Sequence, residues 1–256
     1  MYILLLIIAQ YILQNKMADF PLEPIDPNQL RSAEKLILLV DLDETIIQTT
    51  KHKDAKRVKG EIYEMKPKRT NYHLKIRPDA DRFLKFLSSK FELYACTKSR
   101  HYYAKHIVDI LDPNGALFQN RIISREHFSS TTKEDILPKI CIGGDTSLIC
   151  VLDDKKSMWP NFDQVIKVKK FNFWDSLDEV ICESRKSSST SLLTTDKRVE
   201  IKYNDLGFLL ELLGLLNRVH LHIYNQLSDE EHTMPPSLAS VISQEVKRSK
   251  QIFKRK

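Results

Sequence analysis

Short apolar runs alternate with helical patterns along the middle of the chain. Six runs have the length and the apolar content of strands, at residues 36–40, 72–76, 91–96, 121–124, 147–152 and 165–168. Between them, the apolar residues of 83–87 and of 103–110 recur at helical spacing. Strands that alternate with helices predict an α/β fold, with a parallel sheet covered by helices on both faces.

The same pattern divides the chain into one domain with appendages. Residues 31–226 form the predicted domain, and residues 1–30 are an N-terminal extension. Residues 48–71 are polar and lysine-rich, with neither a helical nor a strand period. Residues 183–196 are rich in serine and threonine, which is typical of a flexible, solvent-facing insertion. Residues 227–256 are expected to be a disordered, basic tail.

A last long apolar stretch predicts one more helix, from an N-cap at Asp205 to about residue 226. Its apolar residues surround most of the helix circumference, so the helix should be buried. Glu211 and Arg218 argue against a membrane span, because charges within a bilayer are costly.

Residues 1–13 are apolar and are the one stretch that resembles a targeting segment. The stretch is too short for an ordinary transmembrane helix and lacks the basic start of a signal peptide. Met17 follows closely and is an alternative first residue. A membrane role is therefore disfavoured, but a membrane or mitochondrial location remains the alternative if this segment is a real anchor.

The composition disfavours several classes of protein function. The chain has four cysteines and no CxxC pair, which disfavours a zinc site or a disulfide scaffold. Only six glycines occur, and neither a GxGxxG nor a Walker-type loop is present. The formal net charge is +6, and the basic residues at 247–256 indicate a nuclear-localisation segment, a contact with polyanions or a solvated terminus.

Polar residues follow three of the predicted core strands. Asp41 and Asp43 come after the first, Thr97 after the strand at 91–96, and Asp153 and Asp154 after the strand at 147–152. Ligands of open α/β sheets bind beyond the carboxyl ends of the strands, so these side chains should share one crevice. The first two acids could bind a divalent cation, act as nucleophile and acid, or do both; an acidic strand exit without chemistry is the alternative.

The residue types favour phosphoryl transfer. No Ser–His or Cys–His pair is placed to make a hydroxyl or thiol nucleophile. Several carboxylates around one point stay ionised only if a cation neutralises them, and an all-oxygen ligand set favours Mg²⁺. A carboxylate beside Mg²⁺ can attack phosphorus and form an aspartyl phosphate, while a threonine hydroxyl bonds a phosphoryl oxygen.

Five segments resemble one family. Residues 41–45 (DLDET) match motif I of the haloacid-dehalogenase superfamily, and Thr97 and residues 153–154 fall where its second and fourth motifs stand. The likeness narrows to the RNA polymerase II C-terminal-domain phosphatases associated with transcription factor IIF and their smaller relatives. It rests on residues 74–78, 111–126, 152–159 and 168–171, and it covers about residues 36–175. It implies a haloacid-dehalogenase-like (Rossmann-like) fold with a small cap or none.

The resemblance also implies roles for the motif acids and for Thr97. Asp41 would be the nucleophile, and Asp43 the general acid and then the base. The backbone carbonyl of Asp43 would reach Mg²⁺ together with Asp41 and with Asp154, the direct metal ligand. Thr97 would bind phosphate, and Asp153 would orient the site and its lysine.

Four further positions are carried over from the family. Lys133 fits the spacing of the motif III lysine best, with Lys139 as the runner-up. Thr45 and Arg77 would contact the substrate phosphate, although a surface charge is the alternative for Arg77 and for Lys133. Trp159 is expected to pack in the core.

The resemblance implies a Mg²⁺-dependent phosphoserine/phosphothreonine protein phosphatase that acts in the nucleus on the RNA polymerase II C-terminal repeat, without direct nucleic-acid binding. Two departures affect the substrate: residues 155–158 replace the family's run before the tryptophan, and residues after 226 are too few for a BRCT domain. Two alternatives remain, a non-catalytic binding module similar to a mitochondrial import receptor and a small-metabolite phosphatase.

Overall fold

A five-stranded parallel sheet forms the centre of the molecule. The computed structural model describes residues 21–186, 198–203, 205–228 and 237–253. The sheet has the order β6-β5-β1-β7-β8, and each neighbouring pair is parallel. The strands are β1 (Leu36–Val40), β5 (Phe91–Cys96), β6 (Ile122–Ile123), β7 (Ile149–Asp153) and β8 (Val165–Lys167). The predicted parallel α/β sheet is confirmed.

Strand β1 is the central strand because its sequence can be buried on both faces. All five of its residues are buried, as expected for a continuous apolar run with neighbours on each side. Leu38 pairs with Leu93 of β5 and with Cys150 of β7, so the three strands end at nearly the same level. This register brings the residues after β1, β5 and β7 to one edge of the sheet.

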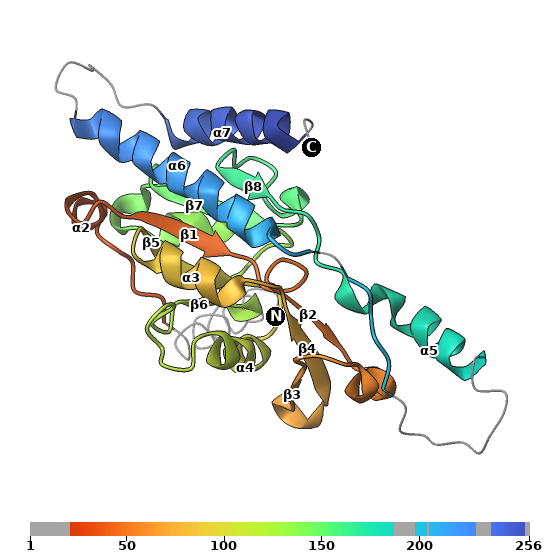
Figure 1. Ribbon diagram of the computed structural model, residues 1–256. Coiled ribbons are helices and arrows are strands. Elements are labelled where there is room, and N and C mark those ends of the chain that lie inside the picture. Colours follow the sequence, from red (N-terminus) through yellow and green to blue (C-terminus); the bar gives the residue numbers. More distant parts are fainter. Residues whose placement is uncertain (1–20, 187–197, 204, 229–236, 254–256) are drawn as a thin grey trace, which may run out of the picture.

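Helices pack against the sheet and against one another. Figure 1 shows α3 (Ala80–Ser88) and α6 (Phe208–Ser228) side by side in front of the strands, and α4 (His101–Leu111) beside β6. In α3, the apolar residues at helical spacing, Phe83, Leu84 and Leu87, are fully buried. The short helix α2 (Pro27–Ser32) precedes β1 and is capped by Asp26, whose side chain accepts a hydrogen bond from the Asn28 amide.

Residues 48–71 were predicted to lack regular structure, and this prediction is wrong at two short strands within them. Strands β2 (Ile47–Thr50) and β3 (Tyr63–Met65) flank β4 (Tyr72–Ile76) in an antiparallel sheet of order β2-β4-β3. The strand predicted at 72–76 is therefore present, but it belongs to this small sheet. Figure 1 places the small sheet beyond the carboxyl ends of the parallel strands, where it makes a small cap.

A second apolar core anchors the small sheet. Phe171, Phe173 and Trp174 pack with residues of the segments 55–58, 177–181 and 199–201. Gln48 of β2 joins this core, because its side chain accepts a hydrogen bond from the Trp174 amide and donates one to Asp175. Helix α5 (Leu177–Lys186) continues from this core to Lys186, so the first residues of the predicted flexible insertion are helical. The remainder, residues 187–196, lies outside the described residues.

The C-terminal part differs from its prediction. Helix α6 begins at Phe208 and not directly after Asp205. The Asp205 carboxylate pairs with Arg77, and its carbonyl accepts a hydrogen bond from the Phe208 amide. Helix α7 (Leu238–Phe253) lies along α6 (Figure 1), so the prediction of disorder for residues 227–256 is wrong over these residues. Its apolar side is buried, and Glu245 accepts a hydrogen bond from Arg218 of α6 at 2.6 Å. Leu210 and Leu221 of α6 stay exposed, so α6 is less buried than predicted.

None of the helices within the described residues is long and apolar enough to cross a membrane. Residues 1–13 lie outside the described part of the chain. The four cysteines are free, and three of them are buried.

Candidate active site

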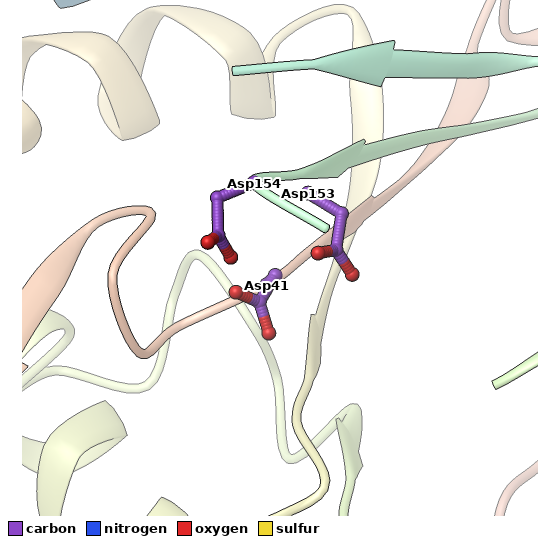
Figure 2. A group of neighbouring side chains, drawn as sticks. All are labelled: Asp41, Asp153 and Asp154. Atoms are coloured by element: carbon purple, nitrogen blue, oxygen red, sulfur yellow. The ribbon is translucent and has the colours of Figure 1, made fainter. Parts of the chain in front are cut away.

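Three carboxylates converge at the carboxyl edge of the parallel sheet. Asp41 follows β1, Asp153 is the last residue of β7, and Asp154 comes directly after it. One oxygen of each lies within 4.8 Å of the others, and all three residues are buried. Figure 2 shows the three side chains directed toward a common centre. The convergence expected from the strand ends is therefore present.

Backbone hydrogen bonds hold Asp41 in position at the end of β1. The Asp41 amide continues the sheet by donating to the Leu152 carbonyl at 2.9 Å. The chain then turns sharply, since the amides of Thr45, Ile46 and Ile47 all donate to the Leu42 carbonyl. This turn returns the Thr45 hydroxyl to Asp41, where it donates to Oδ2 at 2.9 Å and accepts from the Asp154 amide at 3.2 Å.

Lys133 joins two of the acids. Its Nζ lies 2.6 Å from Asp41 Oδ1 and 2.8 Å from Asp153 Oδ2, and it also donates to the Cys96 carbonyl. Lys133 is only 3% exposed, so this ammonium group is paired inside the protein. Burial alone would lower the pKa of Lys133, but the neighbouring acids, Asp41 first, raise it above the ordinary value. The lysine therefore stays charged.

The acids do not share one environment. Burial raises the pKa of Asp41 to about 7, although Lys133 opposes this shift. Asp153 has donors on both oxygens, the Lys155 amide on Oδ1 and both Lys133 and the Trp159 indole on Oδ2. Asp153 therefore holds Lys133 and Trp159 in place, whereas the side-chain partners of Asp41 are Lys133 and Thr45.

Asp154 is the acid that suits a cation. Only 9% of the residue is exposed to solvent, yet its carboxylate has no hydrogen-bond or ion-pair partner among the described residues. Burial is the main cause that raises its pKa. An unpartnered buried carboxylate next to Asp41 provides oxygen ligands without histidine or cysteine, which fits a hard cation such as Mg²⁺. The observed residues therefore fit the predicted metal.

Asp43 points into a different set of contacts. Its Oδ1 accepts from the Tyr103 hydroxyl at 2.6 Å, and its Oδ2 accepts from Ser99 at 3.1 Å and Thr97 at 3.3 Å. The carboxylate of Asp43 is not part of the three-carboxylate group, so only its backbone carbonyl remains as the predicted contact with the metal. Asp43 is nevertheless close enough to contribute to the raised pKa of Asp41.

The other predicted residues separate into those at the site and those beside it. Lys133 lies at the acids, whereas Lys139 Nζ is 3.5 Å from the His127 carbonyl. The Thr45 hydroxyl is engaged by Asp41 and Asp154. Arg77 is buried against Asp205 and donates to the Thr45 carbonyl at 2.8 Å, so its observed contacts are with the protein and not with the three carboxylates. Trp159 is fully buried, as expected.

Sequence reasoning missed two residues that hold Asp43. The spacing of Tyr103 assigns it only to the buried face of a helix, because it matches the other apolar residues of α4. Ser99 stands two residues after Thr97, on the loop that leads into α4. Both could have been suggested by the three hydroxyl-bearing residues Thr97, Ser99 and Tyr103, which follow β5 in the sequence. Their side chains are placed only once α4 packs beside β6.

Comparisons with known proteins identify relatives of this chain. The family described as NLI interacting factor-like phosphatase matches residues 36–194. An RNA polymerase II C-terminal domain phosphatase from Caenorhabditis elegans is 29% identical over 211 residues, which cover 78% of this chain and 30% of the relative. The human protein of the same name is 29% identical over 181 residues, covering 69% of this chain and 19% of the relative. The chain thus spans less than a third of these relatives.

A solved structure has the same fold. It is described as the structure of Fcp1, an essential RNA polymerase II CTD phosphatase. It matches with a TM-score of 0.66 and 23% identity, and the match covers 85% of this chain and 72% of that one. At this identity the likeness establishes the fold, and the predicted haloacid-dehalogenase-like architecture is confirmed.

Proposed function

Since the chain belongs to the NLI interacting factor-like phosphatase family, we propose that it is a Mg²⁺-dependent phosphatase of phosphoserine and phosphothreonine in proteins. Its substrate would be the C-terminal repeat of RNA polymerase II. The relatives' names support this substrate, and a cap of only three short strands favours a peptide over a small metabolite. With such a substrate the protein would act in the nucleus.

The first half-reaction uses Asp41 as the nucleophile. A carboxylate oxygen of Asp41 attacks phosphorus, and the bond between phosphorus and the seryl oxygen breaks. The proton for the leaving oxygen comes from the carboxyl of Asp43, and the phosphoryl group stays on Asp41. Lys133 is already charged and in contact with Asp41, so it offsets the negative charge of the phosphoryl oxygens without moving.

The second half-reaction regenerates the enzyme. Asp43, now a carboxylate, takes a proton from water, whose oxygen attacks the phosphorus of the aspartyl phosphate. Phosphate leaves and Asp41 is restored as a carboxylate. Asp43 suits this double role because Tyr103, Ser99 and Thr97 hold it apart from the three-carboxylate group.

Asp41, Asp154 and the backbone carbonyl of Asp43 would hold Mg²⁺. When bound, the cation supplies charge stabilisation for the transferring phosphoryl group. Asp153 would not need to bind it, because its oxygens are already occupied by Lys133, Trp159 and the Lys155 amide.

The observation that carries the proposal is the buried contact of Lys133 with Asp41 beside the unpartnered carboxylate of Asp154. The protein should release phosphate from p-nitrophenyl phosphate and from phosphoserine peptides of the polymerase repeat when Mg²⁺ is present. An Asp41→Asn change should lower kcat at least about a thousandfold. Asp81→Asn, a change to an exposed carboxylate on α3, is the matched control and should keep the parent activity.

Activity that survives Asp41→Asn, or a folded parent protein that turns over no phosphopeptide with Mg²⁺, would refute the proposal. Faster turnover of sugar phosphates than of phosphopeptides would instead favour a small-metabolite phosphatase.

A further inference from the structure

Glu44 is held between two lysines at the rim of the candidate active site. Its carboxylate lies 3.0 Å from Lys155 Nζ and 3.1 Å from Lys170 Nζ, one lysine on each oxygen. The two lysine side chains are about half exposed, at 57% and 49%, and Glu44 is 25% exposed. The three groups therefore form a small surface cluster, which we call the Glu44 clamp.

The backbone of the Glu44 clamp is rigid. Glu44 has φ of 65°, a conformation that is unfavourable for a residue with a side chain, and it is kept there by two hydrogen bonds of 2.7 Å. One runs from its amide to the Ile47 carbonyl, and the other from the Phe171 amide to its carbonyl. Lys170 precedes the fully buried Phe171, and Lys155 is fixed by the bond from its amide to Asp153. The lysines are thus attached to anchored backbone.

The clamp adjoins the site on the side of the proposed metal ligand. Glu44 follows Asp43 directly, and Lys155 follows Asp154 directly, so each lies one residue, about 3.8 Å along the chain, from a site residue. Figure 2 shows that the loop after Asp41 runs past Asp154. A peptide that extends over this side of the site from a phosphate at Asp41 would therefore pass within reach of Lys155 and Lys170.

The charges of the clamp are not balanced. Two ammonium groups face one carboxylate, which leaves one net positive charge, and Lys156 and Lys169 beside them are exposed as well. A phosphate group carries up to two negative charges and three strong acceptor oxygens, so it matches two ammonium groups better than a carboxylate does. Each ammonium also has three donors, of which Glu44 engages one.

We propose that Lys155 and Lys170 bind a second phosphate of the same peptide while the first is hydrolysed at Asp41. Glu44 occupies this subsite in its absence and keeps the two lysines apart and correctly placed. The inference rests on the proposed function and narrows its substrate class to multiply phosphorylated peptides. Displacing Glu44 breaks two ion pairs whose lysines are about half exposed, so the exchange is easily reversible.

The test compares two sets of peptides with Mg²⁺ present. One set carries a single phosphoserine, and the other carries a second phosphoserine one to five residues away on either side. For the parent protein, KM for the best doubly phosphorylated peptide should be roughly three- to tenfold lower than for the single one. The difference should shrink as salt is raised, because the contacts are exposed.

Three variants distinguish binding of a phosphate at this subsite from an effect of net charge. Lys155→Ala/Lys170→Ala should abolish the KM difference, because KM for the doubly phosphorylated peptide should rise to the value for the single one. Lys85→Ala/Lys247→Ala, which removes two exposed lysines from α3 and α7, should leave the difference intact. Glu44→Gln keeps the shape of the clamp and should widen the difference, because the competing charge is gone.

Equal KM values for both sets in an active parent protein would overturn the subsite and leave the phosphatase proposal standing. Loss of the preference in the Lys85→Ala/Lys247→Ala variant would overturn it too, because net charge would then be the cause. The assignment to phosphate would be overturned if a peptide with aspartate in place of the second phosphoserine had a KM as low as that of the doubly phosphorylated peptide.

Discussion

Lys133 and Asp41 form a buried ion pair, with Nζ 2.6 Å from Oδ1, although the two residues are 92 positions apart in the sequence. Lys133 lies in the segment that precedes β7, and its amide donates a hydrogen bond to the carbonyl of Met158, which follows β7. This bond helps to hold Lys133 in place for the pair. Lys133 is thus held at the same sheet edge as the acids that follow β1 and β7. A charge-neutralising group is in place before any phosphate arrives.

Lys133→Met should lower kcat by a factor of about 10² to 10³, since it removes the cation beside the transferring group. It should also lower the free energy of unfolding by about 3 kcal/mol, because Asp41 and Asp153 lose a buried partner. The measurements are kcat with p-nitrophenyl phosphate at a temperature where circular dichroism shows a folded variant, and chemical denaturation.

Lys139→Met is the matched control, because this lysine is the other one that sequence spacing allows. Its Nζ contacts only the His127 carbonyl among the described residues, at 3.5 Å, so kcat and stability should stay near the parent values. A larger loss of activity in Lys139→Met than in Lys133→Met would contradict the assignment.

The strand-end acids could be located from sequence because two local signals coincide. The run at residues 36–40 is apolar throughout, which only a strand with neighbours on both sides can bury, and the polar residues begin directly after it. In a parallel sheet this suffices to bring Asp41 and Asp153 together, whatever the intervening loops do. Their convergence follows from topology and not from the details of packing.

Other features depend on contacts that no local pattern reports. Strands β2 and β3 are short and mostly polar, and they are strands only because β4 pairs with both. Helix α7 has a helical spacing of apolar residues, yet the basic residues at 247–256 indicated a tail. Arg218 of α6 supplies a partner for Glu245. Arg77 was expected to contact the phosphate, but its guanidinium group pairs with Asp205, which lies 128 positions away in the sequence.

Tyr103→Phe should lower kcat three- to tenfold and leave KM for p-nitrophenyl phosphate nearly unchanged. The reason is that its hydroxyl makes the shortest hydrogen bond to Asp43, at 2.6 Å, and losing a hydrogen bond costs about 1 kcal/mol or more. Tyr102→Phe, on the same helix, is the control; an unchanged kcat in Tyr103→Phe would show that Tyr103 only packs.

Stability of the metal-free protein should fall as pH rises between about 4 and about 7. Asp41 ionises near 3.8 in the unfolded chain, whereas burial raises its pKa to about 7 in the folded protein. Between these values the folded state binds the extra proton, and ionising the buried carboxyl therefore costs stability as pH increases. The Tm difference between the parent and Asp41→Asn, measured in a metal chelator at pH 4.5 and pH 8, isolates this group.

Added Mg²⁺ should oppose that loss, since the cation requires the ionised acids. The rise in Tm on adding Mg²⁺ should be larger at pH 8 than at pH 5 for the parent, and small at both for Asp154→Asn. An increase that is equal at both pH values would contradict a site built on Asp41 and Asp154.

Asp205→Asn should destabilise the fold by about 3 to 5 kcal/mol, because it leaves a buried guanidinium without its counter-charge. Arg77 and Asp205 are buried side chains with Nε–Oδ2 and Nη2–Oδ1 distances of 2.5 and 3.3 Å, and they join the end of β4 to the start of α6. Asp109→Asn breaks an exposed pair with Lys105 and should change stability by less than about 0.5 kcal/mol.

The same variant tests what Arg77 does for the reaction. Arg77 also donates to the Thr45 carbonyl, and the Thr45 hydroxyl donates to Asp41, so a loosened Arg77 should misplace the nucleophile. Asp205→Asn should therefore lower kcat at a temperature where it is folded, with KM for p-nitrophenyl phosphate unchanged. If Arg77 instead binds the substrate phosphate, freeing it from Asp205 should lower KM, and an unchanged kcat with a lower KM would favour the role that the resemblance implied.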